Sequence, residues 1–276
     1  MKKIIANYHT HTKLCGHAIG MSEDYVKQAL ERGFLEIGIS DHGPIPRSWM
    51  SPETYDAMWL SRQMDFEMYK EIYLPDLERT IKKYGHLIKI YKGVEIEYIE
   101  GYDDYYQALL KDLDYLALGM HFFKYKGKFC NTYEEMDIEL LKQYALTAQK
   151  AMESGLFKIF VHPDLFMYNY VLTESPLVFD EICEEVAKDI IEAAIKNDVY
   201  LEVNAGGVAK GKISKDLDEY YYPRSEFWKI VKRYPEAKVI IGCDAHKPSA
   251  LDDDALLDTL KFVEEIGLKV ESKVMF

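Results

Sequence analysis

Cysteine is scarce in this sequence, and the few that occur are scattered at Cys15, Cys130, Cys183 and Cys243. They form no C-x-x-C pair, so a disulfide framework or a zinc finger is not expected. Free thiols fit a reducing cytoplasm, and we predict that location. Long apolar runs are also missing. No stretch approaches the roughly 20 residues of a membrane-spanning helix, so we expect no association with a membrane.

Basic charge is in deficit as well, because the formal net charge is −13. A protein this acidic repels polyanions at long range, which argues against a long nucleic acid as partner. A small phosphorylated substrate remains compatible with this charge if bound metal ions outweigh it locally. Two catalytic motifs are absent too. The sequence contains no G-x-S-x-G elbow of a serine hydrolase and no G-x-x-x-x-G-K-[ST] loop of a nucleotide triphosphatase.

Short apolar runs and helical patterns alternate about seven times along the chain. This alternation is typical of a parallel sheet with crossover helices, either open or closed into a barrel. No linker rich in Pro, Gly or Ser divides residues 1–276, so we predict a single domain. The expected strands are Ile4–Tyr8, Glu36–Ser40, Ile88–Val94, Tyr115–Gly119, Lys158–Val161, Tyr200–Val203 and Lys238–Gly242. The expected helices are Glu23–Arg32 with Ser22 as its cap, Pro52–Tyr84, Asp137–Ser154, Asp180–Asn197, Pro223–Arg233 and Ser249–Glu265.

The sequence has 8 histidines, and all of them except His86 follow an expected strand directly or lie in the loop after it. The carboxyl ends of parallel strands share one rim, so these side chains should converge there. A single histidine at a strand end is more often structural than a ligand, but a whole set at one rim is improbable by chance. Two acids, Glu95 and Asp244, belong to the same set. The histidines in question are His9, His11, His17, His42, His121, His162 and His246.

One tetrahedral metal site takes about four ligands, so this set exceeds the needs of one ion. We therefore predict two to three divalent metal ions. Imidazole and carboxylate ligands suit zinc, iron or manganese, and the sequence does not choose among them. Such ions lower the pKa of a bound water and neutralise charge on a phosphoryl oxygen, which predicts a metal-dependent hydrolase.

The motifs around these residues resemble those of the PHP (polymerase and histidinol phosphatase) family. The resemblance runs along nearly the whole chain, and the stretch from Asn204 to Pro223 is similar to the histidinol-phosphate phosphatase branch. It implies a distorted (β/α)7 barrel with a trinuclear metal site. The motifs are His9-Thr10-His11, Ser40-Asp41-His42, Gly93-Val94-Glu95, Gly119-Met120-His121, Val161-His162-Pro163-Asp164 and Cys243-Asp244-Ala245-His246.

The resemblance also implies a division of the ligands among three ions. His9, His11, Glu95 and Asp244 would hold the first ion. Glu95 would bridge to a second ion that His121 and His162 complete, and His17, His42 and His246 would hold the third. A hydroxide bridging the first two ions would attack phosphorus, with Glu95 as the bridging carboxylate and Asp244 or His246 as the proton carrier.

Substrate recognition is predicted less sharply. Arg47, Lys210 and Arg224 are cationic candidates for the phosphate, and a solvated surface charge is an equal alternative for each. Tyr168 and its aromatic neighbours could form a wall for an imidazole group or could pack within their loop. Histidinol phosphatases often carry a base a few residues after the fifth-strand histidine, but this chain has none after His162.

The leading hypothesis is therefore an L-histidinol-phosphate phosphatase of histidine biosynthesis. One alternative is a phosphoesterase of the same family that acts on another small phosphate ester, a nucleotide or a nucleic-acid end. Another is a metal-binding protein without catalysis, against which the full set of ligands argues. The sequence leaves a homo-oligomer open.

Overall fold

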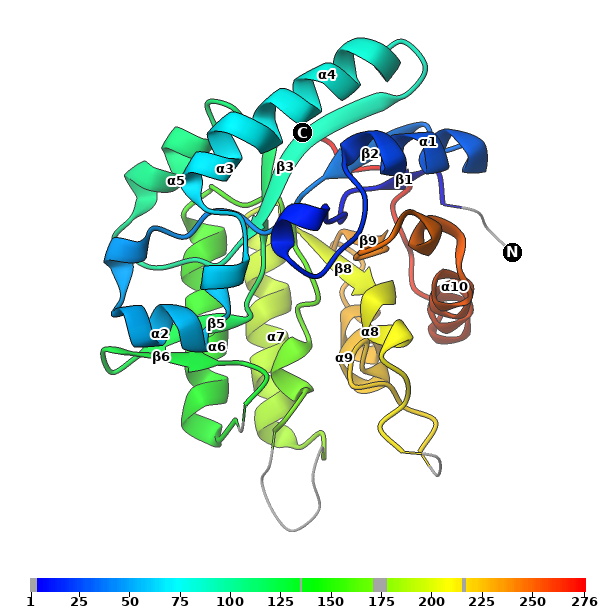
Figure 1. Ribbon diagram of the computed structural model, residues 1–276. Coiled ribbons are helices and arrows are strands. Elements are labelled where there is room, and N and C mark those ends of the chain that lie inside the picture. The colour runs from blue at the N-terminus through cyan, green and yellow to red at the C-terminus, as the bar shows by residue number, and fades with distance from the viewer. Residues whose placement is uncertain (1–3, 135, 171–177, 215–216) are drawn as a thin grey trace.

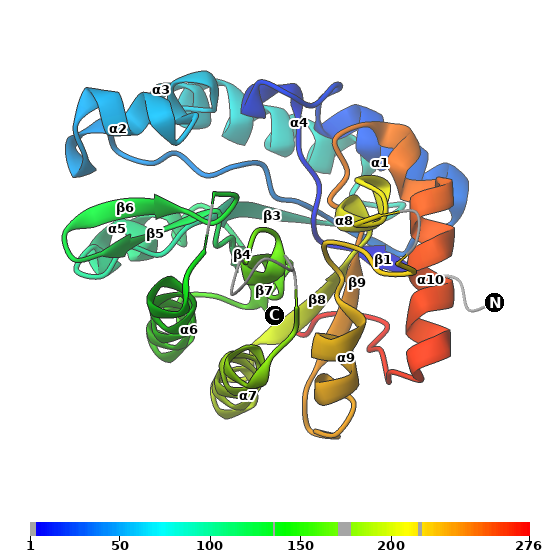
Figure 2. The ribbon, with the colours of Figure 1, turned by 90° about the horizontal axis from the view of Figure 1, so that it is seen from below.

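The computed structural model describes residues 4–134, 136–170, 178–214 and 217–276. Seven parallel strands form one curved sheet in the order β1-β2-β3-β4-β7-β8-β9, and helices surround it (Figures 1 and 2). The predicted distorted (β/α)7 barrel is confirmed. The strands are β1 (Ala6–Asn7), β2 (Glu36–Ile39), β3 (Lys89–Ile96), β4 (Tyr115–Leu118), β7 (Ile159–Phe160), β8 (Tyr200–Asn204) and β9 (Val239–Gly242).

The barrel closes at its rim rather than along whole strands. Beyond the ends of β1 and β9, Thr10 and Ala245 form an isolated parallel bridge. The His11 amide donates to the Ala245 carbonyl at 2.9 Å, and the Ala245 amide donates to the His9 carbonyl at 3.2 Å. This closure brings the first and last ligand motifs of the chain side by side.

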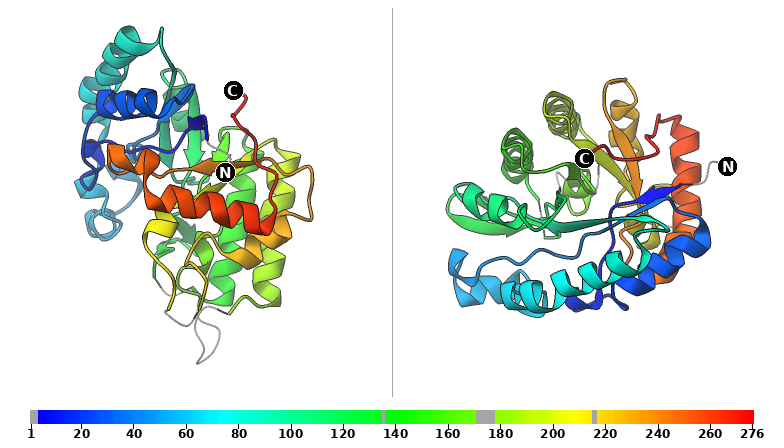
Figure 3. Two further views of the ribbon diagram at one scale, coloured as in Figure 1. Left: turned by 90° about the vertical axis from the view of Figure 1, so that its right-hand side faces the viewer. Right: turned by 90° about the horizontal axis from the view of Figure 1, so that it is seen from above.

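The helices lie outside the sheet, as the views along the barrel show (Figures 2 and 3). No described helix has the length and apolarity that crossing a membrane requires. A small antiparallel hairpin of β5 (Phe122–Tyr125) and β6 (Lys128–Asn131) follows β4. The helices are α1 (Ser22–Arg32), α2 (Pro52–Ala57), α3 (Phe66–Met68), α4 (Leu74–Tyr84), α5 (Asp103–Leu109), α6 (Ile138–Glu153), α7 (Glu181–Lys196), α8 (Ala205–Ala209), α9 (Ser225–Val231) and α10 (Asp254–Ile266).

Three helix predictions need correction. The expected helix Ser249–Glu265 begins only at Asp254, because Asp253 is extended and caps α10 after a 3-10 turn at Pro248–Asp252. The expected helix Pro52–Tyr84 is broken, because Trp59 adopts a left-handed backbone (φ 62°) that ends α2. A π-helical turn, Tyr69–Tyr73, then precedes Pro75, whose ring nitrogen has no proton for the regular helical bond. Ser22 is the first residue of α1 rather than its cap; its hydroxyl is buried and bonds Asp76.

Large side chains fill the inside of the barrel. Tyr115 occupies the centre, and its hydroxyl donates to the Tyr8 carbonyl at 2.6 Å. A Cβ on Gly93 would lie 2.3 Å from the Tyr115 ring, so only glycine fits on the adjacent strand. The interior is thus packed solid below the rim, and any ligand must be received above it. The interior cluster consists of Ala6, Tyr8, Tyr115, Ala117, Ile159, Val161, Tyr200, Ile240 and Val274.

Candidate metal centre

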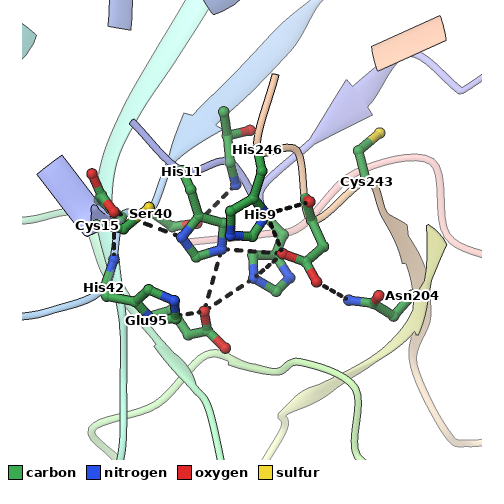
Figure 4. A network of polar contacts seen from close by, with 12 residues as sticks. His9, His11, Cys15, Ser40, His42, Glu95, Asn204, Cys243 and His246 are labelled. Carbon is green, nitrogen blue, oxygen red and sulfur yellow. Dashed lines mark hydrogen bonds and ion pairs between the residues drawn. The ribbon is translucent and has the colours of Figure 1, made fainter. Parts of the chain in front are cut away.

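Six of the seven parallel strands deliver a predicted ligand to one place at the rim. Figure 4 shows His9, His11, His42, Glu95 and His246 pointing toward one another from β1, β2, β3 and β9. The structure also brings His17, His121, His162 and Asp244 into the same cluster: each of these four contributes to at least one group of side chains that could hold a metal ion. The spatial part of the sequence prediction, convergence at one rim, is therefore confirmed.

Glu95 lies at the centre of the cluster, and its two oxygens face different partners. Oε2 is 3.2 Å from His9 Nε2, 3.4 Å from His11 Nε2 and 3.4 Å from His42 Nδ1. Oε1 is 2.9 Å from His162 Nε2 and 3.3 Å from His121 Nε2. A carboxylate with one oxygen toward each of two groups of imidazoles is placed to bridge two ions.

The rest of the cluster shows a gradient of burial. His9 and His11 are fully buried, whereas the His246 side chain is 30% exposed and His17 is exposed. His17 Nε2 lies 2.9 Å from His246 Nε2. Together with His42 these two form a compact group of possible ligands, which is the predicted set for the third ion. The cluster is thus most exposed to solvent where the predicted ligands of the third ion lie.

Charge in this cluster is strongly coupled. Burial alone would raise the pKa of Glu95, but the imidazoles of His121, His9 and His42 outweigh it and hold that pKa well below its ordinary value. Burial lowers the pKa of His246 to about 3, and His11 adds to this effect. Burial would also lower the pKa of His11, but nearby carboxylates raise it to about 9. Glu95 is therefore ionised at neutral pH, and the positive charge beside it compensates for its burial.

The donor set fits metal ions. Neither ring nitrogen of the buried His11 has a hydrogen-bond partner in the described part of the chain, and His162 Nδ1 is in the same position. A buried imidazole nitrogen without a partner costs free energy unless a ligand binds it. Imidazole nitrogens and carboxylate oxygens at this spacing are the ligands that zinc, iron and manganese take in proteins.

Two of the predicted ligands also have a strained backbone. His162 has φ 37° and Asp244 has φ 46°, both in the left-handed region that residues other than glycine rarely adopt. Each such conformation costs about 1–3 kcal/mol, and strain of this kind concentrates at functional sites. The strand ends at β7 and β9 are therefore bent to aim side chains into the cluster.

Several polar residues that the sequence analysis did not select hold the ligands from behind. Glu97 Oε1 lies 2.9 Å from His121 Nδ1. Glu202 lies 3.0 Å from His9 Nδ1, and Asn204 bonds Glu202 in turn. The sequence held a signal for both acids. Glu97 follows Glu95 by two residues just past the end of a strand, and Glu202 is an isolated acid in an apolar strand pattern.

A cavity of about 970 Å³ opens above the cluster, and His42, Glu95, His121 and Asp244 line it. Of the predicted phosphate-binding residues, Lys210 lines this cavity. Its Nζ sits 5.6 Å from the centre of the Tyr133 ring. Tyr168 lines the cavity as well.

The structure does not bring the two arginine candidates to this lining. Arg224 is buried, and its backbone amide donates to Asp164 at 2.6 Å. Arg47 is exposed and lies 5.2 Å from the centre of the Tyr55 ring. Neither arginine is among the residues that line the cavity.

Fold and site together define a (β/α) barrel with a multinuclear metal centre at the carboxyl ends of its strands. The family model described as PHP domain matches residues 7–206, and the chain belongs to this family. The predicted resemblance is thereby confirmed.

Named relatives point the same way. A "Probable histidinol-phosphatase" of Deinococcus radiodurans is 26% identical over 95% of this chain and 94% of its own length. A "Histidinol-phosphatase" of Bacillus subtilis is 27% identical over 46% of this chain and 48% of its own length. Among solved structures, histidinol phosphate phosphatase from Lactococcus lactis, complexed with zinc, L-histidinol and phosphate, superposes over 100% of both chains with a TM-score of 0.70 at 15% identity. That last likeness is one of fold.

Proposed function

We propose that the protein is a metal-dependent phosphomonoester hydrolase that converts L-histidinol phosphate to L-histidinol and phosphate in histidine biosynthesis. The observation that carries the proposal is Glu95, whose two oxygens face two separate groups of imidazoles at the floor of an open cavity. The full-length relative from Deinococcus radiodurans supports the choice of substrate.

The proposed centre holds two to three divalent ions, of zinc, iron or manganese. His9, His11, Glu95 and Asp244 would hold the first, and Glu95 with His121 and His162 the second. His17, His42 and His246 would hold the third. When bound, such ions supply a nucleophile at neutral pH and neutralise charge on the phosphoryl oxygens.

The chain's own residues complete the chemistry. Lys210 lines the cavity and is our candidate for the cationic contact to a phosphate oxygen. Asp244 and His246 also line the cavity, and because both are unprotonated at neutral pH, we assign to one of them the relay of a proton from the attacking water to the leaving alkoxide oxygen. Arg47 and Arg224 are weaker candidates for phosphate contacts because neither lines the cavity.

Aromatic rings adjoin the metal ligands on the side of the second ion. Tyr133 stacks on His121 with ring centres 5.9 Å apart, and Tyr168 meets Tyr133 edge-on at 4.9 Å. Both tyrosines line the cavity. A planar imidazole beside the phosphate would find apolar ring faces there, so we propose Tyr133 and Tyr168 as the wall that receives that part of the substrate.

Another small phosphate ester is the second candidate substrate. It is favoured by the run after His162, which carries no base in the place where histidinol phosphatases often have one. A long nucleic acid is disfavoured, since the net charge is −13. The described thiols are free, which supports our proposal of a cytoplasmic location.

The test is a comparison of substrates with metal-reconstituted protein. Turnover would be measured on L-histidinol phosphate, on nucleoside monophosphates and on a single-stranded oligonucleotide with a terminal phosphate. We expect kcat/KM to be largest for L-histidinol phosphate. Equal or higher values for a nucleotide would refute the narrow assignment, and hydrolysis of none of the three would refute a phosphatase of this kind.

A further inference from the structure

Strand β8 is the one strand of the seven-stranded sheet that supplies none of the predicted metal ligands. It nevertheless carries two buried polar side chains at its carboxyl end, Glu202 (1% exposed) and Asn204 (0% exposed). Burying a carboxylate costs several kcal/mol unless partners compensate it. A strand that buries a carboxylate and an amide next to a predicted metal centre needs an explanation beyond packing.

The hydrogen bonds of these two side chains lead to His9 and Asp244, apart from the bond that Gly207 donates to Asn204, which caps α8. Both oxygens of Glu202 lie 3.0 Å from His9 Nδ1. Asn204 Nδ2 donates to Glu202 Oε1 at 2.7 Å and reaches Asp244 Oδ2 at 3.4 Å, and Figure 4 shows Asn204 on this side of the cluster. Asn204 Oδ1 accepts from the Gly207 amide at 2.7 Å, which fixes the amide group. The side-chain amide of Asn204 therefore contacts both carboxylates, that of Glu202 behind His9 and that of Asp244 beside it.

The neighbouring backbone leaves room for this arrangement. A Cβ on Gly242 would lie 1.9 Å from Glu202 Oε2, so the adjacent strand β9 must carry glycine for Glu202 to fit. A Cβ on Gly206 would lie 2.5 Å from Asp244 Oδ2. The carboxylates on either side of Asn204 thus each occupy a space that a side chain would otherwise fill.

We propose that Glu202 and Asn204 are positioning residues of the metal centre, with Glu202 fixing the tautomer and orientation of His9 and Asn204 holding Glu202 and Asp244 in register. The Nδ1 proton of His9 is donated to Glu202, which leaves the lone pair of Nε2 directed at the space beside Glu95 and Asp244. The inference rests on the proposed metal centre and adds to it the residues that orient its first ion.

The experiment measures metal affinity by competition with a chelating dye, using zinc alone, and metal content after dialysis. Glu202→Gln keeps the size of the side chain but removes its charge, and should weaken the tightest zinc site by about 10–100-fold. Asn204→Ala should weaken it less. Glu36→Gln is the control, because this largely buried carboxylate, 13% exposed, bonds Tyr8 and Lys273 away from the centre. We expect wild-type affinity in the control.

Without metal, Asn204→Ala should melt below wild type, because it also removes the side chain that caps α8. Glu202→Gln should melt near the wild-type temperature, since glutamine keeps the size of the side chain and its oxygen still accepts a hydrogen bond. A purely structural role would instead lower that temperature and leave zinc affinity unchanged, and wild-type affinity in Glu202→Gln overturns the proposal. Nitrogen NMR of zinc-loaded wild type needs no variant and should find His9 protonated at Nδ1; protonation at Nε2 also overturns it. A wild-type protein that binds no zinc would instead remove the proposed centre itself.

Discussion

The two ends of the barrel treat polar groups in opposite ways. At the closed end, the Tyr8 hydroxyl donates to Glu36 at 2.6 Å and accepts from the Val274 amide at 3.1 Å, and Lys273 bonds Glu36 at 2.7 Å. Phe276 covers the Tyr8 and Tyr115 rings, with its chain end inside the ring of helices (Figure 3). These groups, which we name the tail cluster, satisfy one another within the protein.

The rim end is crowded but unsatisfied. His11 has two ring nitrogens without hydrogen bonds, and Glu95 and Asp244 are carboxylates whose pKa values are held far down by imidazoles against the effect of burial. The difference teaches that two buried polar clusters in one barrel can serve opposite purposes. Satisfied groups stabilise the fold, whereas unsatisfied ones create a site for a ligand.

The largest effect should come from a change at the rim. His9→Ala should lower kcat/KM by about three orders of magnitude or more. The change removes a proposed ligand of the first metal ion, and the metal ions would stabilise charge in the transition state. Steady-state kinetics with a thermal melt checks this. His86→Ala, an exposed histidine outside the cluster, is the matched control and should keep full activity. Persistent turnover in His9→Ala would remove the first ion from the mechanism.

The second largest effect should come from removal of the metal ions, which should act on the rim and not on the closed end. Dialysis against a chelator should abolish turnover and lower stability, by about 4 kcal/mol for an ion present at a thousand times its Kd. The loss should be equal in wild type and in a tail-cluster variant such as Tyr8→Phe. Calorimetry with and without zinc measures it. If the chelator leaves both the activity and the melting temperature unchanged, the side chains at the rim do not bind metal ions.

Tyr8→Phe should lower the stability of the fold and leave turnover unchanged. The change deletes the hydroxyl that bonds Glu36 and receives the Val274 amide, and should cost about 1–2 kcal/mol of the free energy of unfolding. Because the tail cluster is separate from the rim, kcat with saturating metal should not change. Denaturant unfolding and steady-state kinetics on the same preparation test this. A large loss of kcat would mean that the two ends are coupled.

Lys210→Ala should affect binding more than chemistry. Loss of a cation that lines the cavity should raise KM about tenfold, equivalent to about 1.4 kcal/mol, with kcat changed less. The matched control is Lys212→Ala on the same loop, since Lys212 pairs with Asp218 and does not line the cavity. Equal KM values for the two variants would reject Lys210 as a phosphate contact.

The smallest effect concerns a surface contact that belongs to neither end. Glu23 of α1 accepts from Lys27, Lys83 and Tyr84, and these bonds lower its pKa to about 2. A depressed pKa stabilises the fold above the unfolded value near 4.5, and that contribution disappears as pH falls from there toward 2. Glu23→Gln should therefore unfold slightly earlier than wild type at pH 7 and together with it at pH 2. An equal difference at both pH values would show that the ionised form is not involved.

Much of the fold could be predicted from the sequence, since each buried strand is a short apolar run between helical patterns. The rim could be predicted as well, because histidines and acids follow those runs directly. The break in Pro52–Tyr84 could not be, because its helical periodicity does not reveal the left-handed backbone of Trp59. The role of β8 also escaped, because Glu202 acts through His9, which lies 193 residues away in sequence.

Substrate recognition was the hardest part to predict, and the reason is physical. The ligands are fixed by strand ends, whose convergence follows from topology. Cationic and aromatic contacts come from loops, where sequence position does not decide which side chains reach the cavity. Lys210 and Tyr168 line the cavity whereas Arg224 is buried beside Asp164, and only packing distinguishes them.

The side chains at the rim are arranged to hold several metal ions. The most direct test is the metal content of the purified protein, measured by mass spectrometry of the elements together with protein concentration, after growth with zinc, iron and manganese present. We predict two to three ions per chain in the wild type and a loss of at least one ion in His9→Ala. One ion or none per wild-type chain would contradict the multinuclear centre.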